Sequence, residues 1–236
     1  MSAGNGRVCL VTGVGPGTGT ALVERFAADG YRVAMLARSG DRLGELEKRI
    51  EASQGFPCDV ADPGALSEAV SAVQSKLGPP RVVIHNAVGG AFGSFLDIDA
   101  ETLERNFRIN TLALFHLARL TVEDMISAGG GALLATGNTS AYRGKALFAG
   151  FAPTKAAQRI LLESIARSVG PKGVHAAYVA IDAVIDVPWT RERFSDKPDE
   201  FFCKPRDIAD ECYRIAHQPR SAWSSELVIR PFGENW

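Results

Sequence analysis

Three glycines follow the first apolar run of the chain, at a spacing that could cradle a phosphate group. The run Val8–Thr12 leads into Gly13, and Gly17 and Gly19 follow as a segment with helical spacing begins at Thr18. Gly13 allows a tight turn, Gly17 lets the backbone approach a pyrophosphate, and Gly19 permits close helix packing. The first turn of a helix also offers N–H groups and a partial positive charge to anions. The spacing predicts a dinucleotide-binding loop, the alternative being an ordinary strand-to-helix turn.

The end of the second apolar run bears on which dinucleotide would bind. A carboxylate at this point holds the ribose 2′-hydroxyl of NAD(H), whereas an arginine accommodates the 2′-phosphate of NADP(H). Here Ala37 is followed by Arg38 and Ser39. A guanidinium pairs with phosphate in a forked geometry, and a hydroxyl adds a hydrogen bond. We predict that NADP(H) is preferred and NAD(H) possible, the alternative being that Arg38 only caps a surface strand.

The elements that would position these groups alternate along the chain. Short apolar runs predict strands at Val8–Thr12, Arg32–Ala37, Arg81–His85, Ala132–Thr136, Val174–Ile181 and Leu227–Ile229. Helical spacing predicts helices at Thr18–Asp29, Asp41–Ala52, Pro63–Leu77, Ala100–Ala128, Ala152–Val169 and Asp207–His217. The alternation predicts an α/β fold, a doubly wound domain with helices on both faces of a parallel sheet. No repeat or long linker divides residues 1–236, so we predict one domain.

The composition excludes several classes of partner. The formal net charge is −1 over 236 residues, so bulk electrostatics favour neither nucleic acid nor a membrane surface. The four cysteines are scattered and the four histidines lie far apart, so no metal site is predicted. Unpaired cysteines are typical of reduced thiols, and we expect a cytoplasmic protein that acts on a small molecule.

Together with later motifs, the glycine loop resembles that of the short-chain dehydrogenase/reductase family. The loop reads Thr-Gly-x-x-x-Gly-x-Gly, Asn86 and Ala87 follow a predicted strand, and Asn110 and Lys155 come at suitable distances. The resemblance extends over nearly the whole chain, and it implies a Rossmann-type sheet of about seven strands in the order 3-2-1-4-5-6-7. It implies that Asn86 and Ala87 border the cofactor, although Val88 replaces the family's glycine at the next position.

The resemblance also implies further contacts with the cofactor. Asp59, together with Val60, matches the family's Asp that accepts a hydrogen bond from the adenine amino group. After the sixth strand the family usually reads Pro-Gly-x-Val-x-Thr, whereas this chain has Ile181–Asp186. Val184 and Ile185 would still contact the nicotinamide carboxamide through backbone groups. The acidic residue that ends this segment would face either the pyrophosphate or solvent.

Four groups act together in the family, and this chain keeps two of them. A Tyr gives the proton, a Lys lowers its pKa and holds the nicotinamide ribose, a Ser orients the carbonyl, and an Asn supports a proton-relay water. Lys155 and Asn110 match their positions. Phe151 stands at the Tyr position and Asn138 at the Ser position. The amide of Asn138 can still polarise a carbonyl, but a phenyl ring cannot donate a proton.

Any proton donor would therefore have to come from elsewhere in the chain. Tyr142 is the first candidate and Ser140 the second, because both precede the Phe151 helix in a loop that faces the nicotinamide in this family. The alternative is that both are ordinary loop residues. Their roles decide whether the site can protonate a substrate.

Two functions remain open on this reading. The first is an NADP(H)-dependent oxidoreductase with a non-standard proton donor, acting on a small or medium carbonyl, alcohol or alkene. The second is an inactive NADP(H)-binding sensor or partner protein. Residues 187–205 are polar and aromatic and would form a substrate lid. Family members are usually dimers or tetramers, and apolar Leu112, Phe115 and Leu120 are consistent with a homodimer or homotetramer.

Overall fold

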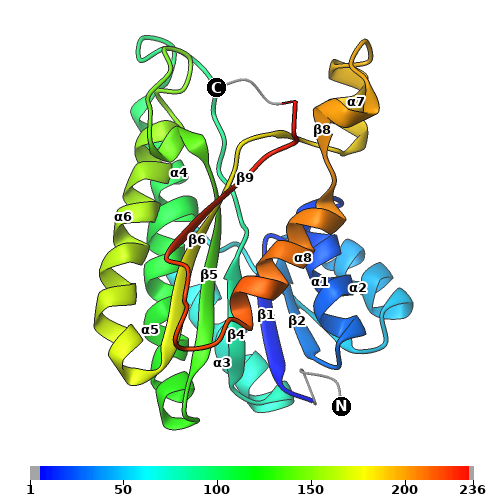
Figure 1. The fold of residues 1–236 in the computed structure, drawn as a ribbon, viewed down its shortest axis with the longest axis vertical. Helices are drawn as coiled ribbons and strands as arrows, with labels where there is room; N and C mark the ends of the chain where they lie inside the picture. The colour runs from blue at the N-terminus through cyan, green and yellow to red at the C-terminus, as the bar shows by residue number, and fades with distance from the viewer. Residues whose placement is uncertain (1–5, 234–236) are drawn as a thin grey trace.

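A parallel sheet of seven strands forms the centre of the molecule (Figure 1). The structure, a computed structural model, describes residues 6–233, so the two ends of the predicted domain, residues 1–5 and 234–236, lie outside the described residues. The strands follow the order β3-β2-β1-β4-β5-β6-β9, and every neighbouring pair is parallel. The predicted single doubly wound domain and its strand order are confirmed.

The strands of the sheet are mostly the predicted apolar runs. They are β1 (Val8–Thr12), β2 (Arg32–Ala37), β3 (Ser53–Pro57), β4 (Pro80–His85), β5 (Gly131–Asn138), β6 (Val174–Ile181) and β9 (Glu226–Ile229). A separate two-stranded pair joins β7 (Val184–Ile185) to β8 (Phe202–Cys203). Because β7 and β8 lie outside the main sheet, the last strand of the sheet is β9.

Helices cover both faces of the sheet. One face carries α1 (Thr18–Ala28), α2 (Gly40–Arg49) and α8 (Pro205–Ala216), and the other carries α3 (Pro63–Leu77), α5 (Ala113–Ser127) and α6 (Ala152–Val169). The side chains of β1 alternate between the two cores: Val8 and Leu10 enter one, Cys9 and Val11 the other. A strand buried on both faces appears in the sequence as a nearly continuous apolar run, and such a run predicted β1. Among residues 6–233, no helix is both long and apolar enough to cross a bilayer.

The helix predicted over Ala100–Ala128 is interrupted. It consists of α4 (Ala100–Phe107), a π-helical turn (Arg108–Leu112) and α5. Asn110 lies in this turn and is fully buried. π-Helical turns widen a helix by one residue and occur frequently at functional sites.

A small ion-paired subdomain, residues 184–205, lies over the carboxyl ends of the strands. It contains β7, β8 and the short helix α7 (Pro188–Arg193). The Asp186 carboxylate accepts hydrogen bonds from Arg191 and Lys204, and both of these also bind Asp199. The hydrogen bonds from Arg191 and Lys204 lower the pKa of Asp186 despite its partial burial. Asp186 therefore ties the ends of this segment together.

Candidate cofactor and active site

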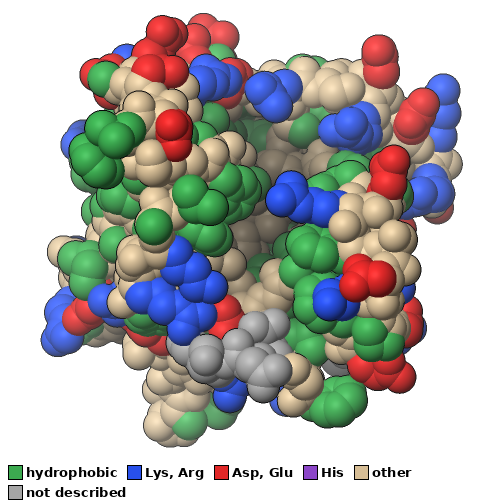
Figure 2. Space-filling model, turned by 90° about the horizontal axis from the view of Figure 1, so that it is seen from above, with side chains coloured by type: hydrophobic (Ala, Val, Ile, Leu, Met, Phe, Trp, Pro, Cys, Tyr) green, Lys and Arg blue, Asp and Glu red, His purple; other side chains and the backbone are tan. Residues whose placement is uncertain are grey.

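A cleft of about 770 Å³ opens at the carboxyl ends of the central strands. Viewed from above, Figure 2 shows this edge of the molecule hollowed, with hydrophobic and basic side chains around the hollow. Most of the residues predicted to bind a cofactor line the cleft, namely Gly13, Gly17, Thr18, Gly19, Arg38, Ser39, Asp59, Val60, Asn86, Ala87 and Ile185. The predicted residues Lys155 and Val184 are not among its lining residues.

Two glycines of the loop are required by close backbone packing. A Cβ on Gly13 would lie 2.4 Å from Ala87 Cα, and the φ of Gly13 is +68°. A Cβ on Gly19 would lie 2.5 Å from the main-chain oxygen of Gly13. Gly17 instead faces the ion-paired subdomain, since a Cβ there would lie 2.7 Å from Val187 Cγ1. The loop is held against β4 with no room for side chains at these points.

The N-terminus of α1 faces the cleft, and some of its polar groups have no hydrogen-bond partner within residues 6–233. Its N-cap residue, Gly17, provides no side-chain hydrogen bond. The Thr18 hydroxyl is buried and has no hydrogen-bond partner among the described residues. Buried polar groups are normally satisfied, so this hydroxyl indicates a missing acceptor or donor. A pyrophosphate at the helix N-terminus fits both observations.

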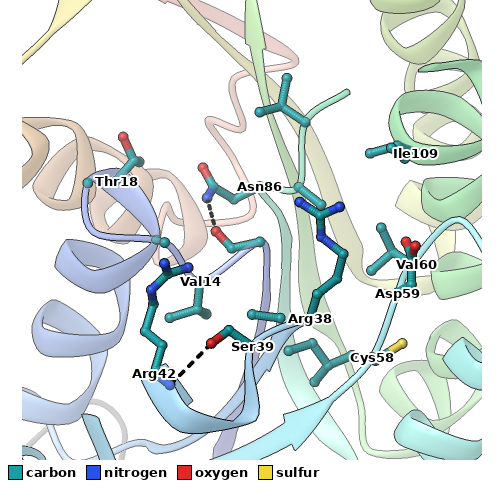
Figure 3. A pocket seen from close by; sticks show the side chains of 18 of the residues that line it. Val14, Thr18, Arg38, Ser39, Arg42, Cys58, Asp59, Val60, Asn86 and Ile109 are labelled. Carbon is teal, nitrogen blue, oxygen red and sulfur yellow. Dashed lines mark hydrogen bonds between the residues drawn. The ribbon is translucent and has the colours of Figure 1, made fainter. Parts of the chain in front are cut away.

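The end of β2 presents two guanidinium groups to the cleft. Arg38 and Arg42 point into the same space on either side of Ser39 (Figure 3). The Ser39 hydroxyl caps α2 by accepting from the Arg42 amide at 3.3 Å. The sequence reading missed Arg42, although a serine cap followed three residues later by an arginine places that arginine in the first helical turn. Together with Ala37, these residues make this rim of the cleft basic.

Asp59 is held in place on the opposite wall. Its carboxylate accepts from the Ala61 amide at 3.0 Å and from Arg105 at 2.9 Å. Burial alone would raise the pKa of Asp59, but these two hydrogen bonds outweigh it and lower the pKa. The carboxylate therefore remains an ionised acceptor beside Val60, and its contact with adenine remains a prediction.

Asn86 links three strands beneath the loop. Its Nδ2 donates to the Gly13 oxygen at 3.0 Å, and its Oδ1 accepts from the Thr136 hydroxyl at 2.9 Å. Val88, which stands where the family has glycine, leaves this network intact because its side chain is 60% exposed at the cleft. The departure from the family motif changes the lining of the cleft and not its framework.

The structure brings Asn110, Phe151 and Lys155 close together through Thr154. Asn110 Nδ2 donates to the Gly89 oxygen and to the Thr154 hydroxyl, both at 2.8 Å. The Thr154 hydroxyl donates in turn to the Phe151 oxygen at 2.7 Å. These bonds fix the start of α6 against the π-helical turn.

Phe151 is packed in an aromatic cluster. Its ring centroid lies 5.7 Å from that of Phe92 and 6.4 Å from that of Phe148. Lys155 Nζ lies 5.8 Å from the centre of the Phe151 ring. The position that the resemblance gives to a phenol therefore offers an apolar face and no proton.

Lys155 is buried without an acidic partner among the described residues. Its Nζ donates to the Thr136 oxygen at 3.3 Å and to Gln158 Oε1 at 3.0 Å. Burial lowers the pKa of Lys155 to about 7. Gln158 was not identified from the sequence, because a glutamine on an amphipathic helix is usually a surface residue.

Replacing Lys155 with methionine should make the stability difference from the wild type depend on pH. Because the folded protein binds this proton less tightly than the unfolded chain, the cost of burying the ammonium is fully present below pH 7. That cost disappears as pH rises from 7 toward the ordinary lysine value. We expect the wild type to gain roughly 3–5 kcal/mol in free energy of unfolding relative to the variant between about pH 6 and pH 10. Urea titrations at both pH values measure it, and an unchanged difference contradicts a buried ammonium.

The predicted carbonyl-orienting residue and the second candidate acid bind each other. Asn138 Oδ1 accepts from the amide and the hydroxyl of Ser140, at 2.9 and 2.7 Å. Asn138 Nδ2 donates to the Ile181 oxygen at 2.9 Å. The Ser140 hydroxyl therefore donates its hydrogen bond to Asn138, and one N–H of the Asn138 amide remains for a further acceptor.

The structure does not bring Tyr142 into the cleft. Its hydroxyl donates to Glu226 Oε2 on β9 at 3.0 Å, and Arg159 lies over its ring. Burial, and then the Glu226 charge, raise the pKa of Tyr142 to about 12. The phenol lies on the outer side of α6 at the sheet edge, so its position does not support the predicted role as proton donor.

Comparison with known proteins agrees with this geometry. Residues 7–198 match the family model described as short chain dehydrogenase. The 7alpha-hydroxysteroid dehydrogenase of Escherichia coli (strain K12) is 25% identical over 97% of this chain and 94% of that protein. The 3-oxoacyl-acyl-carrier-protein reductase MabA of Mycobacterium tuberculosis is 32% identical over 78% of this chain and 72% of its own.

A solved structure gives the same result for the fold. An alcohol dehydrogenase from the archaeon Thermococcus sibiricus, complexed with 5-hydroxy-NADP, superposes with a TM-score of 0.86 and 25% identity, over 97% of this chain and 98% of the other. The family match includes the glycine loop, both walls of the cleft and the start of α6. The chain belongs to the short chain dehydrogenase family.

Proposed function

We propose that this protein is an NADP(H)-dependent oxidoreductase that acts on a small or medium carbonyl or alcohol without a tyrosine as proton donor. The observation that carries the cofactor assignment is the pair of guanidinium groups, Arg38 and Arg42, at the end of β2. The unpartnered Thr18 hydroxyl and the N-terminus of α1 support pyrophosphate binding at the other end. Relatives that act on hydroxysteroids and oxoacyl groups support redox chemistry.

When bound, NADPH supplies the hydride, and the residues of this chain would hold the acceptor. The free N–H of Asn138 is available to a carbonyl oxygen, and the Phe151 ring would pack against an apolar substrate. Val88 and Trp189 line the cleft and are largely exposed, which favours apolar substrates over sugars. Loss of a positioned general acid costs about 10²- to 10⁴-fold in rate, so turnover on simple ketones would be slow.

A non-catalytic NADP(H) sensor is the second candidate. It is favoured by one observation: the phenyl ring of Phe151 and the side chain of Gln158 leave Lys155 without a group that could pass a proton to a substrate. The protein would then bind NADPH without catalysing a reaction.

NADPH oxidation with a panel of apolar acceptors separates the two functions. We expect calorimetry to show tighter binding of NADPH than of NADH, and at least one acceptor to oxidise NADPH. With an aldehyde or ketone, 4-deuterated NADPH should deliver deuterium to the product carbon, whereas with a quinone the loss of NADPH absorbance is the readout. Binding without deuterium transfer to any aldehyde or ketone, and without NADPH oxidation by any quinone, would leave the sensor as the function. Equal binding of the two cofactors would contradict the assignment of NADP(H).

We also propose a homodimer or homotetramer. Leu112 and Phe115 remain partly exposed on the outer side of the π-helical turn and α5, whereas Leu120 packs against the core. Two of the three residues singled out for an interface are therefore available to one.

A further inference from the structure

Gln158 occupies the space beside Lys155 in the interior. It lies three residues further along α6, on the same side of the helix, and is fully buried. Its Oε1 accepts from Lys155 Nζ at 3.0 Å, and its Nε2 donates to the main-chain oxygen of Asn110 at 2.6 Å. One amide thus joins the lysine to the π-helical turn.

The chemistry of the two neighbours fixes the orientation of this amide. A carbonyl oxygen only accepts, so Nε2 must face the Asn110 oxygen, and Oε1 then faces Lys155. The side chain of Asn110 gives no second path, because it is bound to Gly89 and Thr154. The other acceptor at Nζ, the Thr136 oxygen, cannot pass a proton on.

A primary amide cannot do here what a water molecule would do. Water donates and accepts through one oxygen, so a proton can enter and leave it. An amide accepts on oxygen and donates on nitrogen, and carrying a proton across it would require an imidic acid. We propose that Gln158 closes the proton route between Lys155 and Asn110, and that the protein reduces an acceptor that needs no proton from the protein. This inference rests on the proposed oxidoreductase function.

The electron balance defines the class of acceptor. A ketone that receives a hydride at carbon becomes an alkoxide, which is a strong base and needs a proton at once. A quinone that receives a hydride, as NADPH becomes NADP⁺, becomes the hydroquinone monoanion, a phenolate whose conjugate acid has a pKa of about 10. Its second proton can come later from water. An aromatic quinone is therefore the acceptor that this site can reduce without an acid.

An aromatic cluster at the start of α6, beside Lys155, suits a planar aromatic molecule. The ring centroids of Phe92 and Phe148 are 5.1 Å apart, and Phe151 completes the cluster. Phe92 is 67% exposed, so its ring is free to pack against a bound molecule. Aromatic rings gain about 0.5–1.5 kcal/mol per pair beyond area burial.

The test compares two bicyclic acceptors of similar size, naphthoquinone and tetralone. They are assayed with NADPH and the wild type, Phe151→Tyr, Phe151→Tyr/Gln158→Ala and Phe151→Tyr/Gln158→Met. Alanine opens a space with two polar groups at its ends, which water can fill. Methionine matches the volume of glutamine and keeps water out, so it controls for loss of the amide hydrogen bonds.

We expect the wild type to reduce naphthoquinone and to leave tetralone almost untouched. Phe151→Tyr/Gln158→Ala should raise kcat for tetralone at least about ten-fold over Phe151→Tyr alone, within the range of a general acid. The methionine double variant should stay at the level of Phe151→Tyr, and the three variants, which share Phe151→Tyr, should not differ from one another in naphthoquinone rate. The inference is overturned if Phe151→Tyr alone matches the alanine double variant, or if methionine serves as well as alanine.

Crystal structures of the Gln158→Ala and Gln158→Met single variants give a readout that does not depend on turnover. The inference predicts ordered water between Lys155 Nζ and the Asn110 oxygen in the alanine variant and none in the methionine variant. A dry, collapsed space in Gln158→Ala overturns it. If every variant binds NADPH by calorimetry and none oxidises it, the oxidoreductase function fails, and the structures alone decide whether Gln158 closes the route.

Discussion

Replacing Arg38 with alanine is expected to remove most of the preference for NADPH over NADH. A hydrogen bond to a charged group contributes about 1.5–3 kcal/mol, which corresponds to roughly a 10- to 150-fold change in affinity. NADH has no 2′-phosphate, so its affinity should change little. Calorimetric titration of both cofactors into both proteins measures the effect.

Arg42→Ala should weaken NADPH in the same direction, and the double variant should lose the preference altogether. Arg38 and Arg42 border one space, so their effects are coupled and the double loss is less than the sum. Arg49→Ala is the matched control, because Arg49 lies on the same helix but pairs with Glu24 at 2.7 Å. Equal losses in the Arg49 variant would mean that the effect is one of net charge alone.

Replacing Gly19 with alanine should damage the loop through backbone contact alone, because Gly19, unlike Gly13, does not have a left-handed φ. The added Cβ would lie 2.5 Å from the Gly13 oxygen and 2.7 Å from Val14 Cα, both backbone atoms that must move. Overpacking of this kind costs about 1–3 kcal/mol, or roughly 2–10 °C in Tm for a chain of this size. We expect this loss without cofactor, and at least about a hundred-fold weaker NADPH binding.

Gly15→Ala provides the control from the same loop. A Cβ on Gly15 would meet nothing within 4 Å. Its thermal unfolding without cofactor should match the wild type to within about 1 °C. Comparable destabilisation by both alanines would show that the loop tolerates neither side chain for reasons of backbone conformation, and not because of contact with Gly13.

The fold could be predicted because most of its strands are buried on both faces. β1 and β6 are buried throughout, and the predicted and observed bounds coincide. β3 escaped notice because it is an edge strand whose sequence, Ser-Gln-Gly-Phe-Pro, buries a single side chain well. The π-helical turn was not predicted from the sequence. It is accompanied by hydrogen bonds between Asn110 and Gly89, which are distant in sequence and leave no local pattern.

The cofactor half of the site was more predictable than the reaction half. The glycine loop and Arg38 depend on local geometry at strand ends, which a sequence displays directly. The direction of Tyr142 and the burial of Gln158 depend instead on partners distant in sequence, Glu226 and Asn110. The direction of a tyrosine side chain in a loop, or the burial of a glutamine on a helix, cannot be predicted until such partners are known.

The contact between Val187 and Gly17 bears on how long a bound cofactor would stay. Val187 follows Asp186 in the ion-paired subdomain, and it lies directly against the glycine loop. A dinucleotide seated in that loop would leave as Val187 withdraws, and this movement would strain the pairing of Asp186 with Lys204. The residence time of the cofactor would then depend on how fast the ion-paired subdomain opens, more than on equilibrium affinity. Because ions screen charged pairs, the exchange of oxidised for reduced cofactor becomes faster as ionic strength rises.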